Sequence, residues 1–220
     1  MLSVTRYRDR SEAGRKLARL LHLHGADQSV LVLALPRGGV AVALEIARAL
    51  AAPLDVFIVR KLGMPGDEEF ALGAIATGGV RLLDDELIAE EQIPVKTIAT
   101  ITAREMAELH RREAFYRRDR PPLSYSRRHV ILVDDGIATG YTMRSAIAAL
   151  AKLGPASVTA AAPVGSVEAC ETIARTVCEL VCPFRPDPFH AVGLWYEHFP
   201  QVPDEEVAAT LAEADSWSTA

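Results

Sequence analysis

Two adjacent carboxylates, Asp134 and Asp135, are the residues best suited by type and spacing to hold a polar ligand. They follow the apolar run Val130–Val133 directly and precede a turn of small residues, Gly136–Thr142. Paired carboxylates can accept hydrogen bonds from a vicinal diol, such as the two ring hydroxyls of a ribose. The backbone N–H groups and threonine hydroxyls of the turn, at the start of a helix, suit a phosphate. The pattern predicts a ribose 5-phosphate derivative as the ligand.

Short alternating elements are expected to position these acids. Apolar runs bounded by turn residues predict buried strands at Val30–Leu35, Leu54–Val59, Val130–Val133, Val158–Ala162 and Glu179–Cys182. Helical spacing predicts helices from a Ser11 cap onward and at Val40–Leu50, Asp84–Glu91, Thr97–Arg118, from near Tyr141 to Leu153, Val167–Thr176 and Asp204–Ala212. This order predicts an α/β fold, an open, mostly parallel, twisted sheet with helices on both faces. Such sheets bind ligands at the carboxyl ends of their strands.

Two segments depart from this alternation. Phe70–Ala76 and Val80–Leu83 flank the pair Gly78-Gly79, which predicts a short hairpin. Residues 183–203 are rich in proline and hold most of the late aromatic residues, so we expect them to form a small cap, or hood, over the sheet edge. Residues 1–220 are expected to form a single domain, since this length supports one substantial core.

Composition excludes several classes of function. The net charge is −5 with dispersed basic residues, so nucleic-acid binding is not expected. Apolar runs stay shorter than the roughly 18–20 residues of a membrane span, and the polar start Met1–Arg10 does not resemble a signal peptide. Cys170, Cys178 and Cys182 match no common zinc spacing and are expected to be small apolar residues on a helix and a strand. Sparse cysteines favour a reducing cytoplasm.

Two further loops are predicted to reach the same edge of the sheet. Gly38 and Gly39, in the turn P-R-G-G after the first strand, would let backbone N–H groups approach an anion closely. Arg37 beside them can grip a pyrophosphate in a bidentate way. Arg60 and Lys61 open the loop R-K-L-G-M-P-G-D after the second strand, where they could neutralise an anionic leaving group. The glycines and proline of that loop suit a mobile lid.

The run V-I-L-V-D-D-G-I-A-T-G-Y-T resembles the signature of the type I phosphoribosyltransferases, in which two acids precede a small-residue loop ending in T-G-x-T. The P-R-G-G turn then corresponds to their pyrophosphate loop, which implies a cis peptide at Pro36–Arg37. The R-K-x-G run is similar to that of adenine phosphoribosyltransferases. The resemblance implies binding of 5-phosphoribosyl-1-pyrophosphate (PRPP) by Arg37, Gly38, Gly39, Arg60, Lys61, Asp134, Asp135, Gly136, Ala138, Thr139, Gly140 and Thr142.

A motif in the expected cap also resembles this family. The run P-D-x-F followed by V-G and an acid occurs in the hood of hypoxanthine–guanine phosphoribosyltransferases. The resemblance implies that Phe189 stacks on a base and that Glu197 holds a metal through water; Trp195 is a second stacking candidate. Aromatic side chains that simply pack the core of the cap are the alternative.

The resemblance implies a magnesium-dependent transfer of the 5-phosphoribosyl group from PRPP to a nitrogenous base, with purines as candidates, and release of pyrophosphate. The catalytic residues implied are Asp134, Asp135, Arg37 and Lys61, and the Mg²⁺ ligands implied are Asp134, Asp135 and Glu197. Ala138 departs from the 6-oxopurine enzymes, which carry an Asp there, so any general base must lie elsewhere; Glu68 and Glu69 are candidates. The base itself is unidentified.

Other interpretations remain open at this point. The acids could be solvated groups at the end of an ordinary strand–turn–helix, and the protein could be a non-catalytic PRPP-binding regulator. A phospho-receiver domain would need a further strand-end Asp and Lys, and neither a Walker A loop nor a Rossmann fingerprint occurs. The basic cluster Arg104, Arg111, Arg112, Arg117 and Arg118 predicts a solvated helix, or a homodimer face that donates an arginine to its partner.

Overall fold

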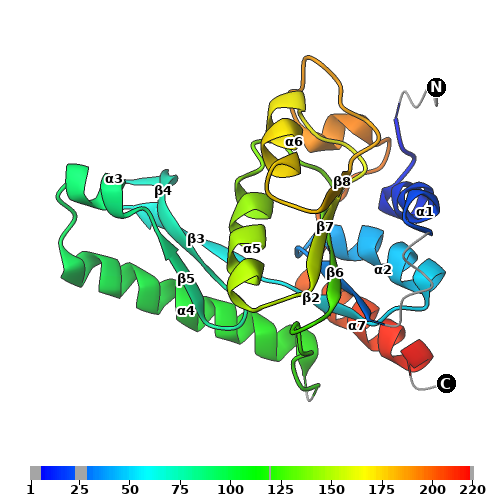
Figure 1. The fold of residues 1–220 in the computed structure, drawn as a ribbon, viewed down its shortest axis with the longest axis horizontal. Helices are drawn as coiled ribbons and strands as arrows, with labels where there is room; N and C mark the ends of the chain where they lie inside the picture. Colours follow the sequence, from blue (N-terminus) through cyan, green and yellow to red (C-terminus); the bar gives the residue numbers. More distant parts are fainter. Residues whose placement is uncertain (1–5, 23–28, 119, 219–220) are drawn as a thin grey trace.

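The computed structural model describes residues 6–22, 29–118 and 120–218, apart from the side chains of 67–69, 217 and 218. Its main sheet has five parallel strands in the order β2-β1-β6-β7-β8 (Figure 1). These strands are β1 (Val30–Ala34), β2 (Leu54–Val56), β6 (His129–Val133), β7 (Ser157–Ala161) and β8 (Glu179–Val181). The expected α/β architecture is therefore confirmed, with β1 and β6 side by side in the sheet.

Helices cover both faces of this sheet because its central strands are apolar on both sides. Val32 of β1 packs into one core with α1 (Arg10–Leu20), α2 (Gly39–Leu50), α4 (Val95–Arg117) and α7 (Asp204–Ser218). Leu31 and Leu33 of the same strand pack into a second core with α5 (Tyr141–Lys152) and α6 (Val167–Ala174). Side chains of a strand alternate between faces, so a continuous apolar run feeds both cores.

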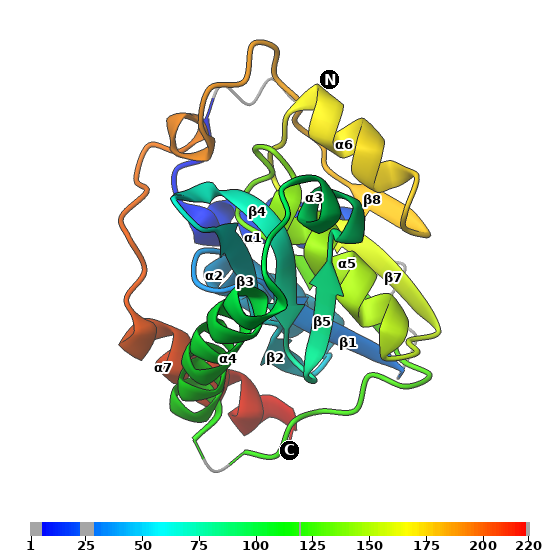
Figure 2. The same cartoon turned by 90° about the vertical axis from the view of Figure 1, so that its left-hand side faces the viewer.

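A second, antiparallel sheet lies beside the first. It has three strands in the order β3-β4-β5, namely β3 (Val59–Met64), β4 (Asp67–Ala76) and β5 (Val80–Leu83). The expected hairpin at Gly78-Gly79 is present, and both glycines have positive φ. Figure 2 shows this sheet and α4 in front of the parallel sheet.

One boundary prediction was wrong in this region. The expected strand Leu54–Val59 ends at Val56, and most of the expected polar loop at Arg60–Asp67 is strand β3. The polar residues of this run indicated a loop. They form strand β3 because β4 supplies backbone hydrogen-bond partners, which a prediction from the local sequence pattern does not include. Register shifts at Gly63 accommodate the glycine within the ladder.

The start of the first helix also differs from the expectation. The N-cap of α1 is Asp9 rather than Ser11, because the Asp9 carboxylate accepts a hydrogen bond from the backbone N–H of Glu12 at 2.7 Å. The short helix α3 (Asp85–Glu90) is capped in the same way by Asp84. Moving the start of α1 to Arg10 places that arginine at the first helical position, on the buried side of the helix.

Residues 183–203 run along one side of the molecule from β8 to α7 (Figure 2). They contain one 3-10 turn, η2 (Val192–Trp195), and a cis peptide at Asp187–Pro188. Backbone hydrogen bonds of 2.8 Å join Tyr7 to Trp195 and to Glu197, so the start of the chain holds this segment in place.

Two observations concern the membrane spans and the cysteines considered from the sequence. None of the helices described is long and apolar enough to cross a membrane. Cys170 and Cys182 are buried free thiols and Cys178 is an exposed one, and no group of three or more His, Cys, Asp or Glu suited to a metal occurs in the described ranges.

Candidate active site

The turns that follow β1 and β6 meet at the carboxyl edge of the parallel sheet. A Cβ on Gly38 would lie 1.9 Å from an Asp135 carboxylate oxygen. A Cβ on Gly39 would lie 2.7 Å from the carbonyl oxygen of Val133 and 3.0 Å from Cα of Asp134. A side chain at position 39 would therefore force the two turns apart, and one at position 38 would displace the Asp135 carboxylate. The peptide between Pro36 and Arg37 is cis, as the sequence led us to expect.

The turn after β6 encloses a cavity of about 140 Å³. Its lining consists of Asp134, Gly136, Ile137, Ala138, Thr139, Gly140, Tyr141, Thr142, Met143 and Val192. Gly140 has φ +74° and directly precedes α5, so the N–H groups of the first helical turn, which have no partner within the helix, lie at the turn. Val192 of η2 closes one side, because a Cβ on Gly136 would lie 2.4 Å from its side chain. The geometry suits a small anionic group.

Asp134 faces this cavity in an environment that disfavours its charge. Burial, reinforced by the neighbouring charge of Asp135, raises the pKa of the Asp134 carboxyl well above its ordinary value of 3.8. One carboxylate oxygen accepts the backbone N–H of Asp135 at 2.8 Å. The carboxyl group lies on the cavity wall, where hydroxyls or a cation can reach it.

Asp135 is directed elsewhere. Its carboxylate accepts a hydrogen bond from Arg10 Nε at 2.8 Å, and both side chains are largely buried, at 10% and 15% exposure for Arg10 and Asp135. Arg10 also donates to the carbonyl of Pro200 at 2.8 Å and lies 3.7 Å over the ring of Phe199. The hydroxyl of Tyr196 donates to the backbone carbonyl of Asp135 at 2.6 Å. Asp135 thus joins α1 and residues 183–203 to the turn rather than lining the cavity.

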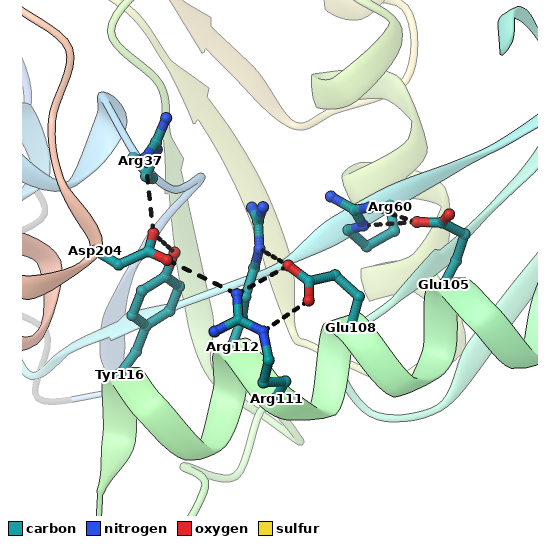
Figure 3. Close-up of polar contacts among 8 residues, drawn as sticks. All are labelled: Arg37, Arg60, Glu105, Glu108, Arg111, Arg112, Tyr116 and Asp204. Atoms are coloured by element: carbon teal, nitrogen blue, oxygen red, sulfur yellow. Dashed lines mark hydrogen bonds and ion pairs between the residues drawn. The ribbon is translucent and has the colours of Figure 1, made fainter.

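Arg60 and Lys61 were expected to act together, but the alternation of β3 sends their side chains in different directions. Arg60 lies against α4, where its guanidinium bonds the carboxylate of Glu105, with Nε at 2.9 Å (Figure 3). Lys61 lines a cavity of about 600 Å³ that shares Thr139, Tyr141 and Thr142 with the cavity beside Asp134. Only Lys61 of the two faces the turn after β6.

The antiparallel sheet is fixed to this turn by a specific hydrogen bond. The hydroxyl of Tyr141, the first residue of α5, donates to the carbonyl of Gly73 in β4 at 2.7 Å. Lys61 is therefore carried on a sheet that is attached to the start of α5. The side chains of Glu68 and Glu69, the candidate general bases, lie outside the described part of the chain.

Arg37 extends from the turn after β1 toward α4 and α7. Its Nη1 lies 3.9 Å from a carboxylate oxygen of Asp204, the first residue of α7. Figure 3 shows Arg37 above Asp204, with Tyr116 and Arg111 of α4 reaching the same carboxylate from below. Arg37 lines none of the cavities described here, whereas Lys61 lines the one that adjoins the turn after β6.

The aromatic residues of the expected cap lie beyond the turn. Phe189 lines a cavity of about 430 Å³ together with Ala138, Thr139, Arg144, Ser166, Glu168, Ala169, Thr172 and His190. Trp195 packs on Phe189 and Phe184, with ring centroids 6.4 and 5.1 Å away, inside a small aromatic cluster. Glu197 is exposed and lines none of the cavities described here. Of these three residues, Phe189 is the one placed beside the turn.

Sequence reasoning missed Arg10, Tyr196, Glu105, Tyr116 and Asp204, which hold the residues it singled out. For Arg10 a signal existed. Arg10 shares a face with Ala13, Gly14 and Leu17, at the spacing of a buried helical stripe, and a charge on such a stripe needs a partner. The other four are polar residues on amphipathic or exposed segments, where nothing in the sequence separates a partner from a solvated side chain.

Mg²⁺ requires oxygen ligands and in phosphate chemistry is held by one or two carboxylates together with substrate oxygens. Asp134 offers one carboxyl group on the cavity wall. The side chain of Asp135 reaches the same turn but is occupied by Arg10. The donor set therefore fits a metal that is shared with a phosphorylated ligand, and it does not form a cage for a metal by itself.

Comparisons with known proteins identify a family for this chain. A family model described as "Phosphoribosyl transferase domain" matches residues 3–183. Two curated proteins of Mycobacterium tuberculosis, both named "Putative phosphoribosyl transferase", are 42% identical over 207 residues, which is 94% of this chain and 46% of theirs. The chain thus spans about half the length of these relatives.

A solved structure shares this fold over most of its length. The protein TT1426 from Thermus thermophilus is 43% identical, has a TM-score of 0.83, and is matched over 94% of this chain and 98% of its own. The family model covers most of the chain, including the turns after β1 and β6. The chain belongs to the phosphoribosyl transferase domain family.

Proposed function

We propose that this protein transfers the 5-phosphoribosyl group of PRPP to a nitrogenous base and releases pyrophosphate. The observation that carries the proposal is the junction of two turns. The glycines of the turn after β1 pack against Asp134 and Asp135, and the turn after β6 encloses a small cavity beside Asp134. A ribose 5-phosphate with a pyrophosphate at C1 would span the two turns.

Each part of PRPP has a proposed partner. The 5-phosphate would bind the N–H groups and hydroxyls of the turn Ala138–Thr142, at the start of α5. Asp134 would accept hydrogen bonds from the ribose hydroxyls. Arg37 and Lys61 would contact the pyrophosphate, with Gly38 and Gly39 supplying backbone N–H groups.

The reaction breaks the bond between ribose C1 and the pyrophosphate oxygen and forms a bond from C1 to a base nitrogen, whose proton passes to solvent. Both electrons of the broken bond leave on pyrophosphate, and positive charge develops on the ribose ring. Arg37 and Lys61 would stabilise the leaving anion, and the carboxylate of Asp134 would stabilise the ring charge. When bound, Mg²⁺ supplies further charge neutralisation of the pyrophosphate oxygens.

Two of the expected roles change in the proposal. Asp135 would act as a positioning residue, because its carboxylate holds Arg10 and abuts Gly38. Arg60 would support β3 through Glu105 rather than bind pyrophosphate. The base would lie in the cavity beside Phe189, which shares Ala138 and Thr139 with the phosphate turn. Residues 183–203 would then form the hood of the site.

The proposal is tested by incubating the protein with PRPP, Mg²⁺ and a panel of purine and pyrimidine bases, and measuring pyrophosphate release. Turnover with at least one base, lost when EDTA is added, is the expected result. Calorimetry with PRPP alone separates the alternative, since tight binding without turnover on any base would identify a PRPP-binding regulator. Absence of PRPP binding would exclude both.

A further inference from the structure

Three side chains, one from the turn after β1 and two from α4, converge on the carboxylate of Asp204. The hydroxyl of Tyr116 donates to Oδ1 at 2.6 Å. Arg37 Nη1 lies 3.9 Å from Oδ1, and Arg111 Nη2 lies 3.9 Å from Oδ2. Figure 3 shows the carboxylate between Arg37 on one side and the two α4 residues on the other. The turn after β1 is thereby connected to both α4 and α7.

The carboxylate of Asp204 is itself held firmly. Tyr116 is only 1% exposed, so its ring is fixed in the core. Burial, together with the hydrogen bond to Asp204, raises the pKa of Tyr116 well above its ordinary value, so its hydroxyl stays protonated and remains a donor. Asp204 begins α7, where the helix dipole favours a negative charge. Asp204 is therefore held by a contact that does not involve Arg37.

Arg111 does not depend on this anchor in the same way. Its guanidinium makes two hydrogen bonds to Glu108, at 2.7 and 3.0 Å. The side chain of Arg37, in contrast, has Asp204 as its one ion-pair partner within the described residues. Removing the Asp204 charge should thus release Arg37 while Arg111 stays bound to Glu108.

We propose that Asp204, held by Tyr116, is the positioning residue of Arg37 and directs its guanidinium to the leaving pyrophosphate. The inference rests on the proposed function, because it assigns Arg37 to that anion. A guanidinium carries five N–H donors in a rigid fork, so the edge at Nη1 can face Asp204 while the other donors face a ligand. The contact with Asp204 restricts the rotamers of Arg37 before the ligand binds, so pyrophosphate binding costs less side-chain entropy.

The sign of the effect separates positioning from simple electrostatics. A carboxylate near an anion site repels the anion, so neutralising a carboxylate with no other role should tighten pyrophosphate binding. Loss of positioning has the opposite effect, since Arg37 must then be ordered on binding. We expect Asp204→Asn to weaken pyrophosphate binding about 3- to 10-fold, a part of the side-chain entropy of one arginine.

The experiment is calorimetric titration of inorganic pyrophosphate, in the presence of Mg²⁺, into wild type, Asp204→Asn, Arg37→Ala and the double variant. Asp204→Asn should have little effect once Arg37 is absent, because the proposed role acts through that side chain. Asp204→Glu should recover part of the affinity. Tyr116→Phe removes only the hydroxyl that holds Asp204 and should weaken binding in the same direction by a smaller factor.

Glu205→Gln is the matched control. Glu205 is an exposed acid in the same first turn of α7, so this variant loses the same dipole interaction and the same charge without touching Arg37. Its pyrophosphate affinity should equal or slightly exceed that of wild type, because only the repulsion of the anion by the carboxylate is removed. Tyr116→Phe also covers the case in which Asp204→Asn lowers stability too far for titration.

The outcomes distinguish the inference from the proposed function. Tighter or unchanged binding by Asp204→Asn, or equal losses with and without Arg37, would overturn the positioning role while PRPP turnover by wild type stands. A wild type that binds neither pyrophosphate nor PRPP would remove the proposed function and the inference together. Weaker binding that requires Arg37 supports the inference.

Discussion

Arg10 Nε donates to the carboxylate of Asp135 at 2.8 Å across 125 positions of the sequence. The pair joins the first helix to the turn after β6, and the same carboxylate lies where a side chain on Gly38 would clash. Arg10 also bonds Pro200 and lies over Phe199, in the segment that follows η2. One guanidinium therefore fixes the relative positions of α1, the paired acids and residues 183–203.

Arg10→Met should destabilise the protein by about 3 kcal/mol, since it leaves the Asp135 carboxylate largely buried without its partner. Urea unfolding at pH 7 measures the change. Arg15→Met is the control on the same helix, because the Arg15 side chain is 45% exposed in its ion pair with Glu45 and should cost below about 1 kcal/mol. Equal losses in the two variants would show that the buried pair has no special role.

Asp134→Asn should increase stability at neutral pH while weakening PRPP binding. The folded-state pKa of Asp134 lies above its unfolded value, so the folded state binds the proton more tightly. Wild type therefore loses stability as the pH rises from the unfolded pKa to the folded pKa of Asp134. The variant lacks this loss, and its advantage should vanish below the ordinary pKa of 3.8. Thermal unfolding between pH 3 and 8 is the measurement. A variant less stable than wild type at pH 7 would contradict the environment described.

The same substitution should weaken PRPP binding by about 1–3 kcal/mol, the scale of a hydrogen bond to a charged group. The ionised carboxylate is the better acceptor, so PRPP affinity of wild type should fall as pH drops through the Asp134 pKa. Asp134→Asn should lack this pH dependence. Subtracting its pH profile from that of wild type removes the contribution of the titration of PRPP itself. Calorimetry at several pH values tests this, and parallel pH profiles would argue against Asp134 as a ribose ligand.

Lys61→Gln and Arg60→Gln should have different consequences because the two side chains leave β3 in different directions. Lys61→Gln should raise the KM for PRPP by about 10-fold, equivalent to one lost charged contact, with stability little changed. Arg60→Gln should instead lower stability by about 1–3 kcal/mol, because Glu105 is 6% exposed and loses a hydrogen-bonding partner. Steady-state kinetics and urea unfolding on both variants separate the roles; a reversed pattern would refute the assignment.

Gly38→Ala should reduce both PRPP affinity and stability, since its Cβ would lie 1.9 Å from the Asp135 carboxylate and must displace that group from its contact with Arg10. An overpacking cost of about 1–3 kcal/mol is expected. Gly154→Ala is the comparison, because Gly154 has φ +69° and open space around it, so it should lose stability through backbone strain alone. Differential scanning calorimetry and PRPP titration measure the two effects. Weaker PRPP binding by the Gly154 variant would show that the effect is not local.

The sequence by itself determined most of the elements, β3 excepted, and the order of the turns. Apolar runs such as Val130–Val133 predict buried strands because a short apolar run between turn residues is a local pattern. Gly38 and Gly39 predict a close approach of the backbone to another group because only glycine tolerates it. Parallel strands bring their carboxyl ends to one edge, so the meeting of the turns after β1 and β6 could also be predicted. The paired acids with their small-residue turn likewise sufficed to indicate the family.

The partners of those residues were decided only by the tertiary structure. The sequence offers Arg10, Arg60 and Arg37 many carboxylates, and the choice of Asp135, Glu105 and Asp204 depends on how helices far apart in the chain pack together. The extent of β3 was missed for the same reason, because a polar run becomes a strand when a neighbouring strand supplies its hydrogen bonds. Local patterns specify which backbone forms; long-range packing specifies which charges meet.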